Sequence, residues 1–169
     1  MNLDLGSLAS TFLDKDALSI VAEKAGVSTK DVSSVISQAL PTLLNGANKQ
    51  STNSSTAEGF AKALLQHSSA NTSNISSFLK GVDLDDGAKI VSHLLDGKTS
   101  DIASDLSKKL NLDSKQIATI LSCAAPLLMS LLGKKAKDSS KDNDSLSSIA
   151  SSLLSNVDVG SVLTSFLKK

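Results

Sequence analysis

The sequence contains no tryptophan, no tyrosine and no arginine among its 169 residues. With only four phenylalanines as aromatic residues, a binding surface anchored on large amphipathic rings is excluded. Arginine makes the bidentate contacts that read phosphates and bases, and here seventeen basic residues, all of them lysines, are balanced by seventeen acidic residues to a net charge of zero. The composition therefore argues against nucleic acid as the main partner.

Cysteine is also nearly absent, since Cys123 is the single one. One cysteine excludes an internal disulfide and a thiolate metal cluster, and a reducing compartment is the simplest interpretation. Residues 1–15 have neither a basic start nor a long apolar run, and they carry Asp4 and Asp14. We therefore expect no signal peptide and a cytoplasmic protein.

Internal repetition is what the sequence does contain. Residues 2–15 and 156–169 are near copies, and residues 16–49 align without a gap on residues 101–134. Self-similarity at a fixed spacing is typical of proteins built from repeated helical or strand units. The repetition predicts an architecture and says little about chemistry.

The apolar residues recur at helical spacing throughout, and no segment alternates as a strand would. We predict an all-α helical repeat with two pseudo-equivalent units at 2–49 and 83–134. Each unit has a leading helix, a helix-turn-helix-like hairpin and a long helix kinked at a proline, Pro41 or Pro126, through which the apolar pattern continues in phase.

The units are expected to form a single all-helical domain over residues 1–169. Between and after them the sequence predicts connectors and short helices at 50–82, a serine- and lysine-rich linker at 135–148, and C-terminal helices at 149–169. Within 50–82, Ser55 and Glu58 have the spacing of a capping box.

The segment 156–169 resembles a leading helix with no hairpin after it. Its apolar face must be buried somewhere, on its own chain or on a second copy, and is therefore a predicted association face. This face consists of Val159, Val162, Leu163, Phe166 and Leu167.

The hairpin at 20–37 resembles the helix-turn-helix of lactose-repressor-type regulators through the run VAEKAGVS at 21–28. In that family the second helix enters the major groove, and the resemblance implies DNA contacts by its first residues. Here these are Thr29, Lys30, Ser33 and Ser34. The family has Thr at position 31 and Arg at position 34, and this chain has neither, so a purely structural hairpin is the other interpretation.

Residues 116–133 form an eighteen-residue run without charge that is followed by lysines. This length is at the lower edge of a membrane-spanning helix. The aligned residues 31–48 carry polar side chains and would make a poor membrane helix. A helix buried inside the protein is therefore favoured.

Few residues suggest chemistry. His93 has no second histidine or cysteine at metal-ligand spacing, and Cys123 has no histidine close in sequence. No glycine-rich phosphate loop is present. We expect a non-enzymatic protein with no catalytic residue, no metal and no cofactor.

The run GAKIVSHLLDG at 87–97, followed by a hairpin and a long helix with an alanine–proline step, resembles the YidB-like family of uncharacterised bacterial proteins, domain of unknown function 937. The resemblance spans most of residues 2–134. It implies an all-helical fold and no established activity.

The sequence thus favours a protein-association or self-assembly module, with a protein as partner, including a second copy of the chain. Two alternatives stay open. One is a DNA-binding protein that uses the hairpin at 20–37, and the other is a membrane-associated protein that uses residues 116–133.

Overall fold

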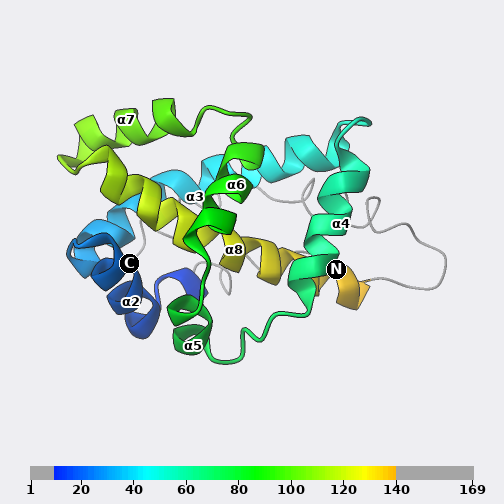
Figure 1. The fold of residues 1–169 in the computed structure, drawn as a ribbon, viewed down its shortest axis with the longest axis horizontal. Coiled ribbons are helices and arrows are strands. Elements are labelled where there is room, and N and C mark those ends of the chain that lie inside the picture. Colours follow the sequence, from blue (N-terminus) through cyan, green and yellow to red (C-terminus); the bar gives the residue numbers. More distant parts are fainter. Residues whose placement is uncertain (1–9, 140–169) are drawn as a thin grey trace.

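Helices make up the described part of the chain. The computed structural model describes residues 10–139, which contain α-helices and no strand (Figure 1). The helices with full bounds are α2 (Lys15–Ala25), α3 (Thr29–Thr52), α4 (Ala57–Ser68), α5 (Ile75–Lys80), α6 (Leu84–Leu94), α7 (Thr99–Leu110) and α8 (Ser114–Ser139). The all-α prediction is confirmed. The C-terminal helices predicted at 149–169, with their association face, lie outside the described residues.

Helix α8 lies at the centre of this arrangement. All six other helices contact it, and α4 and α6 do so most extensively. In Figure 1, α6 crosses in front of α8 near its midpoint. The side chains of Ile117, Ile120 and Leu128 on α8 have no exposed surface. Burial of apolar surface around this one helix is therefore the main source of the fold's stability.

The turns of both hairpins use a left-handed residue. Gly26 ends α2 with φ 70°, and Asn111 ends α7 with φ 56°. A left-handed backbone suits glycine and is tolerated by asparagine. Ser28 then begins α3 with a capping box, in which its hydroxyl accepts from the Asp31 amide at 3.1 Å and its own amide donates to the Asp31 carboxylate. These local preferences make α2–α3 a tight hairpin, as predicted.

Each long helix continues through its proline. Pro41 lies inside α3 and Pro126 lies inside α8. Because proline has no backbone N–H, the carbonyl of Ser122 loses the donor that it would have in a regular helix. Gly87 of α6 lies directly against this carbonyl oxygen, and a Cβ atom at Gly87 would overlap it. A residue without a side chain thus lets α6 cross α8 at close range.

The two long helices differ in how much of their surface is covered. In the sequence alignment, three exposed positions of α3 correspond to three buried positions of α8. The α3 residues are Gln38, Thr42 and Asn45, and the α8 residues are Cys123, Leu127 and Ser130. α3 keeps one solvent face, whereas α8 is covered all round in this region, so its sequence is almost uniformly apolar. The exact equivalence of the two units stays a prediction from the sequence.

Two local predictions were wrong. Ser55 and Glu58 do not form a capping box, because Thr56 is the N-cap of α4 and its side chain makes no cap hydrogen bond. The hydroxyl of Ser55 instead donates to Asn53 Oδ1 at 2.7 Å, which is a competing local turn. The predicted linker at 135–148 also begins too early, since α8 continues to Ser139.

Candidate functional site

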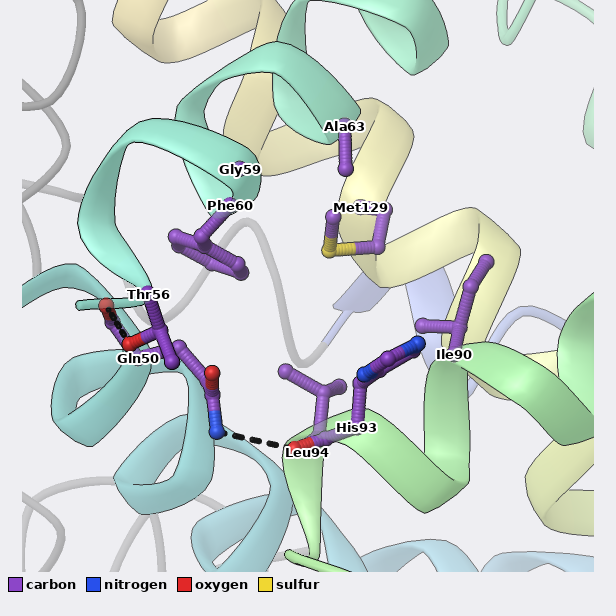
Figure 2. Close-up of a pocket in the computed structure, with 9 residues that line it drawn as sticks. All are labelled: Gln50, Thr56, Gly59, Phe60, Ala63, Ile90, His93, Leu94 and Met129. Carbon is purple, nitrogen blue, oxygen red and sulfur yellow. Dashed lines mark hydrogen bonds between the residues drawn. The ribbon is translucent and has the colours of Figure 1, made fainter.

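An apolar groove opens between α4 and α6, above α8 (Figure 2). Its volume is about 310 Å³. A cavity of this size is at the lower end of the range that ligands occupy in proteins, roughly 300–1,000 Å³. The residues that line it are Gln50, Thr56, Gly59, Phe60, Ala63, Ile90, His93, Leu94 and Met129.

The walls of the groove are firmly packed. Phe60 is 8% exposed, Leu94 is 4% exposed, and Met129, which comes from α8, is 2% exposed. In Figure 2 the Phe60 ring and the Met129 thioether face the space from one side, and Ile90 and Leu94 approach it from α6. Because these side chains belong to the hydrophobic core or pack against it, the groove is an extension of the core to the surface.

Polar groups lie at one end of the groove. Gln50 Nε2 of α3 donates to the backbone carbonyl of His93 at 2.9 Å, and Thr56 Oγ1 donates to the backbone carbonyl of Gln50 at 2.8 Å. These two bonds tie the end of α3 to α6 and to the start of α4. They hold the groove open by fixing the three helices that border it.

Gly59 leaves part of the wall without a side chain. A Cβ atom at Gly59 would meet nothing within 4 Å, unlike a Cβ atom at Gly87. Glycine inside a helix is unfavourable by roughly 0.5–1 kcal/mol relative to alanine. No steric demand in the described structure explains this glycine, and its effect is to widen the groove.

The residues that line the groove do not form a recognisable catalytic site. His93 is exposed at its rim, and no group of three metal-capable side chains occurs among residues 10–139. The other histidine, His67, lies 3.9 Å from the Asp86 carboxylate and joins the end of α4 to the start of α6. The side chains around the groove can therefore bind apolar groups and offer hydrogen bonds at one end, but they do not assemble a nucleophile with a base.

Cys123 lies in the core and away from the groove. Its side chain is fully buried, and burial raises the pKa of the thiol from 9.0 to about 11, against a smaller lowering effect of Lys24. A thiol with a raised pKa carries little thiolate at neutral pH and is a poor nucleophile. This supports the structural interpretation of Cys123.

The four residues of the DNA alternative do not form an equally accessible set. Thr29 and Lys30 are exposed on the first turn of α3, whereas Ser33 and Ser34 are half-buried. The turn before them contacts α8, because Gln116 Nε2 of α8 donates a hydrogen bond to the carbonyl of Gly26 at 3.3 Å. The hairpin therefore helps to join the two halves of the fold.

The membrane alternative concerns α8. Residues 114–134 are long and apolar enough to cross a membrane, with a mean hydropathy of 1.7. However, 78% of this apolar stretch is buried inside the protein. The core helix of a soluble protein can have the same length and hydropathy. The packing of six helices around α8 favours the core interpretation over the membrane one.

The sequence did not predict the groove, because the residues that line it are spread along the chain from Gln50 to Met129. The single hint was Gly59, a glycine within a helix that has no turn to make. The predicted association residues could not be placed, since Val159, Val162, Leu163, Phe166 and Leu167 lie outside residues 10–139.

Comparisons with known proteins give a family and no function. The family described as bacterial protein of unknown function (DUF937) matches residues 8–135. No curated protein and no solved structure matches the chain.

Proposed function

Since the chain belongs to the bacterial DUF937 family, whose function is unknown, we propose from its own geometry that it is a non-enzymatic protein-association module. The partner in this proposal is a second copy of the chain. The groove between α4 and α6 of one copy receives apolar side chains from the other.

The observation that carries the proposal is an open apolar space of about 310 Å³ that continues the core to the surface. Water in such a space gains few hydrogen bonds from Phe60, Ile90 or Met129, so its replacement by an apolar side chain is favourable. Burying one phenylalanine or leucine side chain contributes about 1.5–3 kcal/mol. An amphipathic helix that inserts one or two anchors into a groove is a common mode of protein recognition.

The charge distribution agrees with this mode. Gln50, Thr56 and His93 are the polar lining residues, and Gln50 and Thr56 already use side-chain donors within the protein. No acidic residue and no lysine lines the groove. Recognition would therefore depend on shape and apolar contact, with little dependence on salt.

Static light scattering of the full chain over a concentration series tests the proposal. We expect the molar mass of the native chain to rise with concentration. Gly59→Leu should keep it close to that of a monomer, because Gly59 lines the groove, a Cβ atom there meets nothing within 4 Å, and we expect the rest of the leucine side chain to occupy the groove. Gln66→Leu is the matched control, since it adds a leucine to the same helix at an exposed position outside the groove lining.

Two results would overturn self-association through the groove. One is a native chain that remains monomeric over the whole series. The other is a Gly59→Leu variant that associates as strongly as the native chain while its helicity by circular dichroism is unchanged.

DNA binding is a second candidate because one observation favours it. The α2–α3 hairpin has the Gly26 cap and the Ser28 capping box, and it leaves Thr29 and Lys30 exposed at the start of the second helix. The test is binding to duplex DNA over a salt series, with Lys30→Ala as the comparison. A phosphate contact by Lys30 would make the salt dependence of native binding steeper by about one counterion. Absent or salt-independent binding removes this candidate.

A further inference from the structure

Phe12 shows where the aromatic residue of the segment 2–15 lies in the folded chain. Phe12 is 2% exposed, and it lines a small space together with Val21 and Ile36 of the first hairpin and Leu127 of α8. Residues 156–169 are a near copy of this segment, and Phe166 stands where Phe12 stands in it. A chain with two copies of one anchoring segment needs two places in which to bury an aromatic ring.

The site of Phe12 cannot serve both copies. The space that remains around Phe12 is about 10 Å³, close to the volume that one water-sized probe occupies. A second ring does not fit there. Phe166 therefore needs another apolar site, on its own chain or on a second copy.

Two spaces in the described part of the chain are large enough to compare as sites for this ring. One, of about 340 Å³, lies between α3 and the turn that joins α6 to α7, and its lining includes Lys49, Asn53, Asp96 and Lys98. An aromatic ring there would take water from charged groups without replacing their hydrogen bonds. The other is the groove between α4 and α6, whose lining includes no aspartate, glutamate or lysine.

We propose that residues 156–169 occupy the groove between α4 and α6, with Phe166 as the anchor that enters the space beside Gly59. The inference rests on the proposed function, because it names the segment that the groove receives. The remaining apolar residues of the segment, Val159, Val162, Leu163 and Leu167, would cover the rim formed by α4 and α6.

The length of chain outside the described residues permits this contact. α8 ends at Ser139, and residues 140–156 can span at most about 60 Å when fully extended. α8 itself, with 26 residues, is about 39 Å long. The segment can therefore reach the groove of its own chain or the groove of a second copy.

Disulfide cross-linking of the full chain tests whether residues 156–169 occupy the groove. The variant carries Gly59→Cys in the groove and Val162→Cys in the segment, one turn before the retained Phe166. Mild oxidation at pH 8 should join the two cysteines. Cys123 does not compete, because burial raises the pKa of its thiol to about 11. The control replaces Gly59→Cys by Leu65→Cys, which is on the same helix, is half-exposed and does not line the groove.

The form of the cross-linked product separates the two proposals. A disulfide-linked dimer supports both the occupant and self-association. A monomer with an internal disulfide migrates faster than the reduced chain in a denaturing gel. This product supports occupation of the groove by residues 156–169 of the same chain, and it overturns self-association through that contact. Cross-linking no faster than in the Leu65→Cys control overturns the occupant, whereas the light-scattering comparison of Gly59→Leu still decides whether the groove mediates association.

A second variant keeps the test valid if the cysteine pair disturbs folding. Phe166→Ala in the otherwise native chain should increase the rate at which a protease cleaves residues 140–169 by at least tenfold, and Phe166→Leu should restore most of the protection. Equal cleavage rates for the native, Phe166→Ala and Phe166→Leu chains would contradict anchoring by Phe166.

Discussion

The backbone of Gly87 lies against the carbonyl oxygen of Ser122, at the point where α6 crosses α8. Pro126, four residues after Ser122, has no N–H to offer this carbonyl, so α6 crosses α8 at a carbonyl without its usual helical donor. α6 also forms one wall of the groove through Ile90, His93 and Leu94. The width of the groove thus depends on how closely α6 can approach α8.

Gly87→Ala should lower the free energy of unfolding by about 1–3 kcal/mol, because the added methyl group forces α6 away from α8. Urea denaturation followed by circular dichroism measures this change. Gly59→Ala is the matched control: it replaces a helical glycine at which the Cβ atom meets open space, and it should raise stability by roughly 0.5–1 kcal/mol. A Gly87→Ala chain as stable as Gly59→Ala would show that the two helices are not in close contact.

The left-handed caps of the two hairpins give opposite predictions. Gly26→Ala should destabilise the chain by about 1–2 kcal/mol, since alanine is strained at φ 70° although nothing lies within 4 Å of its Cβ atom. Asn111→Gly should be neutral or stabilising by a few tenths of a kcal/mol, because it relieves a residue at φ 56°. Thermal unfolding of both variants checks the signs. A stable Gly26→Ala chain would mean that the turn after α2 is not left-handed.

The thiol of Cys123 should be unreactive toward thiol reagents in the native chain at pH 8 and should react fully in denaturant. Because its pKa is about 11 in the folded chain and 9.0 when the thiol is exposed to water, its contribution to stability is constant below pH 9 and falls as the pH rises from 9 to 11. In that window the unfolded chain releases the proton first, which costs up to about 2–3 kcal/mol of stability. Urea denaturation at a series of pH values measures the loss, and Cys123→Ala should lack it, whatever its stability at neutral pH.

Leu128→Ala should destabilise the chain by about 2–5 kcal/mol, since Leu128 has no exposed surface and its removal leaves a cavity in the packed centre of α8. Leu84→Ala, at a leucine that is 37% exposed, should change stability by less than about 1 kcal/mol. Similar effects of the two substitutions in chemical denaturation would contradict the central position of α8.

Local structure could be predicted from the sequence where a particular backbone conformation or helix end favours one type of residue. The left-handed cap at Gly26 and the capping box at Ser28 are features of this kind, because short-range geometry decides them. The predicted capping box of Ser55 and Glu58 is also a local feature, and this prediction was wrong. Asn53 offers Ser55 a competing hydrogen bond two residues away, and a spacing pattern does not reveal which of two local bonds forms.

The candidate site could not be predicted in this way. Gln50 meets His93 across 43 residues of sequence, and Met129 reaches the same groove from α8. Such contacts depend on how closely helices cross. The absence of a side chain at Gly87 lets α6 approach α8, whereas a Cβ atom at Gly59 would meet nothing within 4 Å. The sequence shows both glycines as helix-weakening residues and does not show that one is crowded and the other open.

The central position of α8 also affects the order in which the protein can be made. Each of the helices α2 to α7 packs against α8, which is the last of the described helices to be synthesised. Until the ribosome has released residues 114–139, the parts of the earlier helices that α8 covers in the folded chain stay exposed, although these helices also contact one another. At roughly 5–20 residues per second, this interval lasts for seconds. The fold of the described residues is therefore completed by the arrival of a single helix.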